Sequence, residues 1–282
     1  MVVVFIAGLS HSGSTLLDLL LGAHSRLVGL GELDRVLDFP PEKFEEERVM
    51  PCTCGQPVRE CPFWAGAFDR LAPLPPADRR AALLAHFAET FGPDTALVDS
   101  SKYLPALERL RAVPDADIKV LHIIKDVRGF TVSQRDALDK ELRYASIPLL
   151  AGSKTLTRLV HRLTTRQPLY LFLKWARRNR AIRDYCAAHG LPRLAVSYDR
   201  LCHSPEAALT EICSFLGVPY EPAMLVPLNT GSHIFWGNPM AGNRERHARI
   251  EYDDRWKTRR DWRLAARLLP GVLRENREWV GE

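Results

Sequence analysis

The chain begins with the stretch VVVFIAGLSHSGSTLL, residues 2–17. Its β-branched and aromatic residues up to Ala7 predict a buried strand, and the leucines from Leu16 onward predict a helix. Between them lies a turn of small and polar residues, in which Gly8 and Gly13 permit a tight backbone path. A strand, a glycine-containing turn and a helix in this order predict a loop whose N–H groups bind a phosphate-like anion at the helix N-terminus.

This loop differs from the loops that bind nucleoside triphosphates at one position. Those loops read Gly-x-x-x-x-Gly-Lys-Ser/Thr, whereas here Ser14 follows Gly13 in the place of the lysine. Because that lysine contacts the β- and γ-phosphates, its replacement argues against a triphosphate ligand. The loop is therefore predicted to bind another anion of the same general kind.

The composition is ordinary for a soluble globular protein, and the length fits one large α/β domain or two small ones. With 282 residues, 46% hydrophobic and 26% charged, and only short proline-rich stretches, the chain is predicted to form a single domain over residues 1–282. Its first residues lack the basic region of a signal peptide, and no apolar run approaches the roughly 18–20 residues that span a bilayer. The six cysteines are too sparse for a disulfide framework. We therefore expect a cytoplasmic protein without a membrane span.

Four further apolar runs, at 27–30, 96–98, 119–124 and 194–196, predict buried strands. They are nearly continuous rather than alternating, as is typical of parallel strands that are covered on both faces. Helical patterns separate most of them, at 15–23, 77–91, 103–112, 128–142, 170–189 and 205–216. This alternation predicts an α/β fold, a P-loop-like three-layer sandwich with a central parallel sheet and helices on both faces.

Polar side chains follow each predicted strand, and the carboxyl ends of parallel strands meet at one edge of a sheet. Besides the first loop, these side chains are Glu32, Ser100, Ser101, Lys102, Lys125, Arg128, Ser133 and Tyr198. One carboxylate among several anion-binding groups is typical of group transfer, in which a base activates an acceptor and cations hold a leaving phosphate.

In these motifs the chain resembles the sulfotransferases that use 3′-phosphoadenosine 5′-phosphosulfate (PAPS), in particular bacterial members related to the protein-tyrosine and carbohydrate branch. The family loop Arg/Lys-Ser-Gly-Ser/Thr-Thr matches HSGST at 11–15, and its Arg followed by Ser eight positions later matches KDVRGFTVS at 125–133. The family's Tyr-Glu-Asp-Leu is similar to VSYDRL at 196–201, which precedes FLGVP at 215–219. DSSK at 99–102 resembles its lysine-bearing strand end. The motifs cover residues 1 to about 220 in the family's order.

The resemblance implies a set of residues that bind PAPS. For the phosphosulfate these are Ser12, Gly13, Ser14, Thr15 and Leu16; for the rest of the nucleotide they are Lys125, Arg128, Ser133 and Tyr198. It further implies that a C-terminal segment at about 231–262 covers the cofactor, with Lys257 or a neighbouring arginine at the 3′-phosphate. Trp236 and Trp256 in this segment are equally consistent with core packing.

Two positions depart from the family pattern. Lys125 replaces an arginine and loses its bidentate fork, for which Arg128 is expected to compensate. His11 replaces Arg or Lys, and it would bind the transferring group either when protonated or, when neutral, by donating an N–H. Alternatively, His11 faces away and is structural. We expect Lys102 to stabilise the leaving group more than its family counterpart does.

The implied reaction moves the sulfuryl group from PAPS to a hydroxyl of a carbohydrate, a phenol or tyrosine, or a natural product, giving PAP and a sulfate ester without a metal. Glu32, Lys102 and His11 are the predicted catalytic residues, with Glu32 as the base. Glu32 could instead cap a helix or pair with Arg35, in which case Asp34 and Asp99 are the next candidates.

Two other functions remain open from the sequence alone. One is an ATP-dependent P-loop kinase or phosphotransferase, which would need magnesium and the missing lysine. The other is a non-catalytic nucleotide-binding protein, against which Glu32 and Lys102 argue. The sequence does not fix the oligomeric state.

A cysteine motif lies at about 50–64, where Cys52-x-Cys54 is followed by Cys61. The two-residue gap of zinc knuckles is missing, no fourth ligand is apparent, and the nearest downstream histidine, His86, lies in a helical pattern. We therefore expect a structural insert with buried thiols, with a metal site or a disulfide as the alternatives.

Basic residues are concentrated between 140 and 183. They are Lys140, Arg143, Lys154, Arg158, Arg162, Arg166, Lys174, Arg177, Arg178, Arg180 and Arg183. A leucine stripe at 156, 159 and 163 favours solvated helix faces; the alternative is a basic wall that attracts PAPS or an acidic acceptor. Nucleic acid is not favoured, because aromatic residues do not interleave with the basic ones.

Overall fold

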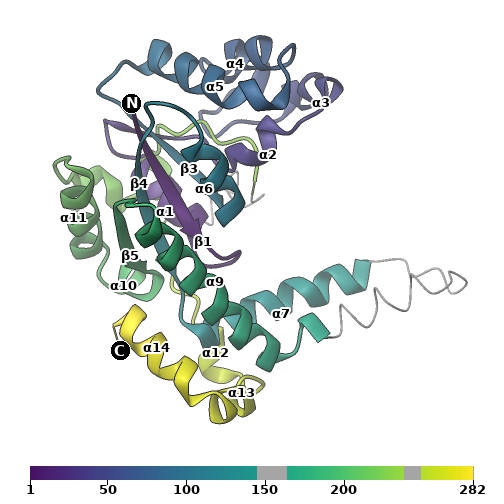
Figure 1. The fold of residues 1–282 in the computed structure, drawn as a ribbon, viewed down its shortest axis with the longest axis vertical. Helices are drawn as coiled ribbons and strands as arrows, with labels where there is room; N and C mark the ends of the chain where they lie inside the picture. Colours follow the sequence, from purple (N-terminus) through teal and green to yellow (C-terminus); the bar gives the residue numbers. More distant parts are fainter. Residues whose placement is uncertain (145–163, 238–248, 282) are drawn as a thin grey trace, which may run out of the picture.

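The structure is a computed structural model and describes residues 1–144, 164–237 and 249–281. Its strands are β1 (Val2–Gly8), β2 (Leu27–Gly29), β3 (Ala96–Lys102), β4 (Asp117–Ile124) and β5 (Arg193–Ser197). They form one sheet in the order β2-β3-β1-β4-β5, and every neighbouring pair is parallel (Figure 1). The predicted parallel sheet is confirmed.

The longer helices are α1 (Ser14–Leu21), α4 (Trp64–Leu71), α5 (Pro76–Phe91), α6 (Leu104–Arg111), α7 (Val127–Tyr144), α9 (Pro168–Ala188), α11 (Pro205–Leu216) and α14 (Pro270–Val280). Shorter ones are α2 (Leu33–Leu37), α3 (Pro41–Glu46), α10 (Tyr198–His203), α12 (Arg255–Thr258) and α13 (Arg263–Leu268), with 3₁₀ turns η1 (Glu47–Val49), η2 (Val58–Glu60), η3 (Pro222–Leu225) and η4 (Pro227–Asn229). The predicted helices are present to within about two residues at each end. The sequence did not predict the helices α4, α13 and α14, nor the continuation of β3 through its polar residues to Lys102.

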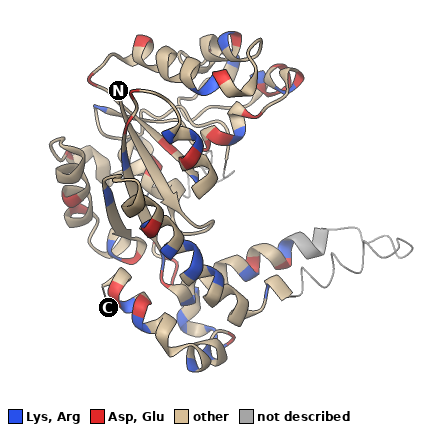
Figure 2. Cartoon of the chain, in the orientation of Figure 1, with Lys and Arg blue, Asp and Glu red and all other residues tan. Residues whose placement is uncertain are grey.

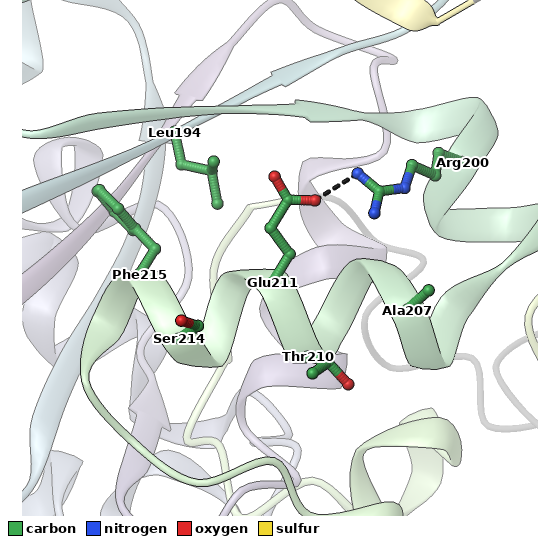
Figure 3. Close-up of a pocket in the computed structure, with 7 residues that line it drawn as sticks. All are labelled: Leu194, Arg200, Ala207, Thr210, Glu211, Ser214 and Phe215. Atoms are coloured by element: carbon green, nitrogen blue, oxygen red, sulfur yellow. Dashed lines mark hydrogen bonds and ion pairs between the residues drawn. The ribbon is translucent and has the colours of Figure 1, made fainter.

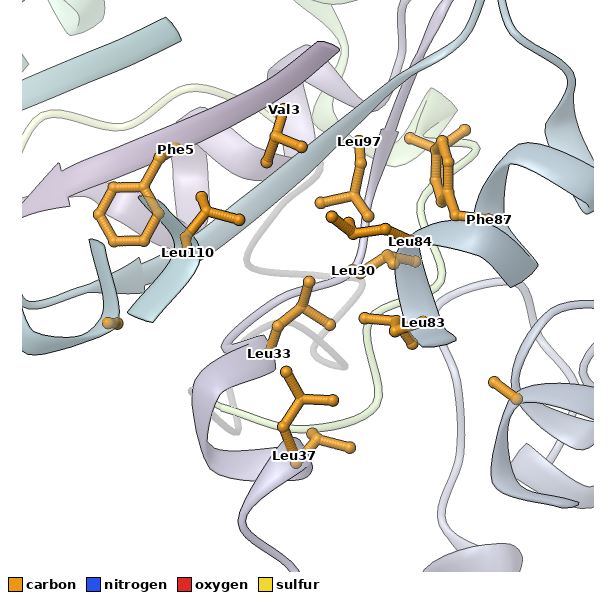
Figure 4. Close-up of a cluster of buried hydrophobic side chains, with 14 of the residues drawn as sticks. Val3, Phe5, Leu30, Leu33, Leu37, Leu83, Leu84, Phe87, Leu97 and Leu110 are labelled. Carbon is orange, nitrogen blue, oxygen red and sulfur yellow. The ribbon is translucent and has the colours of Figure 1, made fainter. Parts of the chain in front are cut away.

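The alternation of side chains along β1 divides the core into two layers. Val3 and Phe5 pack with residues of α2, α4, α5, α6 and α9 on one face, as Figure 4 shows for part of this cluster. Val4 and Ile6 pack with residues of α1, α10 and α11 on the other face. The sheet is thus covered by helices on both faces, which confirms the predicted three-layer sandwich.

A third apolar cluster attaches the C-terminal helices to the body of the protein. Residues of α13 and α14 pack against α7 and α9, and the rings of Trp175 and Trp279 lie 5.4 Å apart between their centroids. Trp175 also donates its indole N–H to the backbone oxygen of Lys125, at 2.9 Å. This packing holds the C-terminal part of the chain beside the carboxyl end of β4 (Figure 1).

The strand order reverses between β1 and β4. From β1 the chain passes through α1 to β2 on one side of the sheet, whereas from β4 it continues to β5 on the other side. In open parallel sheets, ligands bind beyond the carboxyl ends of the strands at such a point. We therefore expect the ligand-binding site at the loop after β1 and the first residues after β4.

The two interpretations of the basic region around 140–166, solvated helix faces and a basic wall, depend in part on residues 145–163. Lys154, Arg158 and Arg162, together with the leucine stripe at 156, 159 and 163, lie outside the described residues.

Among the residues that are described, no helix is long and apolar enough to cross a membrane.

The buried carboxyl of Asp18 in α1 gives the fold a pH dependence. Burial is the largest cause that raises its pKa from 3.8 to about 7. The unfolded chain ionises Asp18 above pH 4 while the folded chain keeps it protonated, so its contribution to stability decreases as the pH rises from about 4 to 7. At about 1.4 kcal/mol per tenfold change in the protonation equilibrium, this amounts to about 4 kcal/mol at most.

We predict that Asp18→Asn is more stable than the wild type at pH 8 and loses that advantage at pH 4. Denaturant unfolding at both pH values measures the difference, with Asp94→Asn, an exposed loop position, as the control. A difference in the free energy of unfolding that is equal at both pH values would contradict the prediction.

Candidate active site

The loop after β1 is built around Gly13. This residue caps α1 in the left-handed region, with φ of 93°. A Cβ atom at this position would lie 2.4 Å from Cδ2 of Tyr198, so the ring of Tyr198 rests directly on the loop. The position therefore requires glycine for both its backbone conformation and its space.

Two of the predicted catalytic residues, His11 and Lys102, also have left-handed backbone, with φ of 66° and 69°. Such conformations are costly for residues other than glycine and concentrate at functional sites. His11 is exposed to solvent at part of its surface, while neighbouring residues cover the rest. This partial burial is the largest cause that lowers its pKa, followed by the positive charges of Lys102, Lys125 and Lys174. The free protein thus favours the neutral imidazole, which donates one N–H.

The register of the sheet brings Lys102 next to the first loop, because Ala7 of β1 pairs with Lys102 of β3. The ammonium of Lys102 donates a hydrogen bond to Glu32 Oε1, and both side chains are buried. Arg35 Nε lies 3.3 Å from the other oxygen of Glu32. The predicted base and the predicted cation are therefore in direct contact, and the structure also contains the alternative pair with Arg35.

The two other candidate bases are engaged elsewhere. Asp34 binds Arg80 Nη2 at 2.6 Å and Arg109 Nε at 2.8 Å. Asp99 is fully buried and accepts a hydrogen bond from the backbone N–H of Ser101 at 2.9 Å, and burial raises its pKa. The Asp34 carboxylate thus holds arginines of α5 and α6, and the Asp99 carboxylate holds the end of β3. Glu32 is the candidate that contacts Lys102.

A second cationic cluster lies after β4. Lys125 Nζ donates to Ser133 Oγ at 3.1 Å and to Asp253 Oδ2 at 2.8 Å. Ser133 Oγ also donates to Asp253 Oδ2, at 2.9 Å, and Arg255 binds both oxygens of Asp253 at 2.7 and 2.9 Å. Burial opposes the ionisation of Asp253, but hydrogen bonds from Arg255 and the charge of Lys125 outweigh it and hold its pKa well below its usual range. One carboxylate therefore lies where two cations and a hydroxyl converge.

Tyr198 connects the first loop with the cluster after β4. Its ring contacts Gly13, Lys125 Nζ lies 4.8 Å from the ring centroid, and its hydroxyl accepts a hydrogen bond from the backbone N–H of Asp253 at 3.2 Å. The hydroxyl donates in turn to the backbone oxygen of Glu251, at 3.3 Å. Tyr198, the residue that follows β5, thus fixes the C-terminal segment beside the first loop.

Two residues predicted to bind the nucleotide have other partners. Arg128 binds both carboxylate oxygens of Asp126, at 2.9 and 2.6 Å, and its guanidinium lies 4.0 Å from the ring centroid of Trp256. Lys257 Nζ lies 5.3 Å from the ring centroid of Tyr252. The arginine that joins Lys125 and Ser133 is Arg255, which the sequence indicated only as a neighbour of Lys257.

The basic residues of α9 divide into two groups. Arg180 pairs with Glu275 and Arg183 with Asp184, which agrees with solvated helix faces. Lys174 lies close enough to the first loop for its charge to lower the pKa of His11. Figure 2 shows Lys and Arg gathered on α9 and around the C-terminal helices.

An open groove lies away from these clusters, beside the edge strand β5. Figure 3 shows its lining, mostly from α11, with an ion pair between Arg200 and Glu211. The one cation in its lining, Arg200, is paired with Glu211, so several cations do not converge there and we do not assign the reaction to it.

The cysteine insert has a partner that the sequence did not reveal. Cys52 and Cys61 are buried, and all six cysteines are free, so no disulfide forms. His233 Nδ1 lies 3.2 Å from Cys61 Sγ, although 172 positions separate the two residues. The expectation that the three cysteines lack a fourth candidate ligand was therefore wrong.

The fold and the site are those of an α/β protein with cations and hydroxyls gathered at the carboxyl edge of a parallel sheet. The sequence profile of the sulfotransferase family matches residues 4–222, and the chain belongs to this family. Among curated proteins, none matches the sequence significantly.

Two solved structures are similar to the chain over nearly its whole length. The sulfotransferase domain of the curacin biosynthetic pathway is 21% identical, with a TM-score of 0.55, and the match covers 95% of this chain and 97% of that domain. The sulfotransferase domain of the olefin synthase of Synechococcus PCC 7002 is 20% identical, with a TM-score of 0.54, and the match covers 96% of this chain and 94% of that domain. At this identity the likeness supports the fold.

Proposed function

We propose that the protein transfers the sulfuryl group of PAPS to a hydroxyl of an acceptor and releases PAP. The observation that supports this most is the position of the Asp253 carboxylate among Lys125, Ser133 and Arg255. A carboxylate so placed marks a site for a second anion near the first loop. PAPS carries two such anions, its 3′-phosphate and its phosphosulfate.

The cationic cluster after β4 and the first loop would divide the nucleotide between them. Lys125, Ser133 and Arg255 would bind the 3′-phosphate once Asp253 turns away. The N–H groups of the first loop and the hydroxyls of Ser14 and Thr15 would bind the phosphosulfate at the N-terminus of α1. Tyr198, which contacts both the first loop and Lys125, sets the distance between these two parts of the site.

In the transfer, the acceptor oxygen forms a bond to sulfur while the bond from sulfur to the phosphate oxygen of PAP breaks. Glu32 takes the proton of the acceptor hydroxyl. Lys102, which contacts Glu32 in the free protein, stabilises the negative charge that develops on the leaving oxygen. His11 donates an N–H to the same region.

Ligand-induced thermal stabilisation tests the nucleotide directly. PAP at about 100 times its dissociation constant should stabilise the fold by about 2.7 kcal/mol, which for a chain of this length raises the melting temperature by about 5 °C. Adenosine 5′-monophosphate, which lacks the 3′-phosphate, should give a much smaller shift. Stabilisation by ATP with magnesium and none by PAP would contradict the proposal and favour a kinase.

Replacement of the base should separate turnover from binding. We predict that Glu32→Gln lowers the transfer of label from sulfur-labelled PAPS to a pool of hydroxyl acceptors by about 10²- to 10⁴-fold. Its stabilisation by PAP should remain, because Glu32 does not contact the nucleotide in the proposed mechanism.

The matched control is Asp34→Asn, because its carboxylate anchors Arg80 and Arg109. This variant should lose stability while its turnover stays within a few-fold of the wild type. Near-normal turnover of Glu32→Gln, or a larger loss in Asp34→Asn, would show that the base is misassigned.

Asp253 should compete with the 3′-phosphate. Asp253→Asn removes the charge that neutralises Lys125 and Arg255, so we expect PAP to bind about fivefold more tightly, equivalent to about 1 kcal/mol. Adenosine 5′-monophosphate should be unaffected.

Asp254→Asn makes the same change in net charge at the neighbouring exposed position and should leave PAP affinity unchanged. Calorimetric titration of the three proteins measures these constants. Weaker binding of PAP by Asp253→Asn would mean that this carboxylate organises the site rather than competing for it.

A further inference from the structure

The cysteine insert and the segment 231–237 bring four metal-ligand side chains together outside the proposed active site. They are Cys52, Cys54, Cys61 and His233, and their ligand atoms all lie within 4.8 Å of one another. Cys52, Cys61 and His233 are buried, and Cys54 is the most open to solvent of the four. Three thiols and one imidazole are a common donor set for structural zinc.

The distances within this cluster suit a tetrahedral ion. With Zn–S bonds of about 2.3 Å, tetrahedral geometry places two sulfur ligands about 3.8 Å apart and a sulfur and a nitrogen about 3.6 Å apart. Cys52 Sγ and Cys61 Sγ are separated by 3.8 Å, and Cys61 Sγ and His233 Nδ1 by 3.2 Å. A disulfide needs about 2.05 Å between sulfur atoms, so the cluster fits an ion better than a covalent bond.

Hydrogen bonds around the cluster hold its two segments in place. Thr53 donates its backbone N–H to Ile234 O at 2.9 Å and its hydroxyl to Ser232 O at 2.6 Å. The indole N–H of Trp64 donates to the backbone oxygen of His233. Such supporting bonds orient ligands in metal sites. The histidine is thus held against the cysteine loop by contacts that do not involve its own ring.

We propose that Cys52, Cys54, Cys61 and His233 bind one Zn²⁺ ion as a structural site. Thiolate and imidazole ligands select zinc over the harder divalent cations. Binding releases the protons of the three thiols and leaves the imidazole neutral. Four protein ligands close the coordination shell, so the ion stabilises the fold and takes no part in the transfer.

The ion would join parts of the chain that reach the proposed base. From His233 the segment 231–237 continues to Trp236, whose backbone oxygen would lie 2.8 Å from a Cβ at Gly31. At its end, a Cβ on Gly237 would lie 3.1 Å from Cγ of Glu32. Zinc therefore pins this segment against the loop that carries Glu32.

Metal analysis of the full-length protein, purified without chelators from zinc-supplemented cells, tests the site independently of any transferase activity. We expect one zinc ion per chain in the wild type and at least a tenfold loss in Cys54→Ser and in His233→Asn. His86→Asn is the matched control: it is another buried histidine beside Phe63, and it should keep its zinc. A strong chelator should lower the melting temperature of the wild type and of His86→Asn, but not of Cys54→Ser.

Cobalt substitution of the wild type gives a readout that does not depend on the folding of any variant. Co²⁺ at this site should show the intense thiolate charge-transfer absorption and the visible bands of a tetrahedral ion. Wild-type protein that contains no zinc and takes up neither zinc nor cobalt would overturn the proposal. So would full zinc occupancy in both ligand variants, or another metal at full occupancy.

Discussion

The proposed active site depends on the position of β1 in the centre of the sheet, hydrogen-bonded in parallel to β3 on one side and β4 on the other. The pairing of Ala7 with Lys102 and of Gly8 with Ile123 brings three chain segments to one edge. The first loop, the left-handed turn at Lys102 and the start of α7 then lie together. A shift of one residue in either pairing would exchange the two faces of a strand and separate these groups.

Buried positive charge is the second constraint on this edge. Lys102 and Lys125 are both buried, and a buried ammonium is costly unless it is paired. In the free protein Glu32 pairs with the first and Asp253 with the second. We infer that the 3′-phosphate of PAPS replaces one of these internal anions, Asp253. Glu32 and Lys102 stay in place, where Glu32 can take the proton of the acceptor hydroxyl. The free energy of binding the nucleotide then depends on how much more favourably Lys125 and Arg255 interact with the 3′-phosphate than with Asp253.

The sequence predicted the parts of this account that depend on local patterns. The loop at 9–13, the five strands and the polar residues at their ends follow from hydrophobic runs and glycine positions, and the family resemblance ordered them. Asp253 and His233 were missed because they lie outside the helices and strands, in segments with no periodic pattern. Arg255, at the start of the short helix α12, was indicated only as a neighbour of Lys257. His233 meets Cys61 only because the segment around Thr53 and Ile234 is hydrogen-bonded across the fold. Sequence spacing contains no signal for such a contact.

We propose that Lys125, Ser133 and Arg255 form the 3′-phosphate site and that Asp253 occupies it in the free protein. A crystal structure of the complex with PAP tests this most directly. We expect the 3′-phosphate within hydrogen-bond distance of Lys125 Nζ, Ser133 Oγ and the Arg255 guanidinium, with the Asp253 carboxylate turned away from Lys125. PAP bound elsewhere, or bound while Asp253 still contacts Lys125, would contradict it.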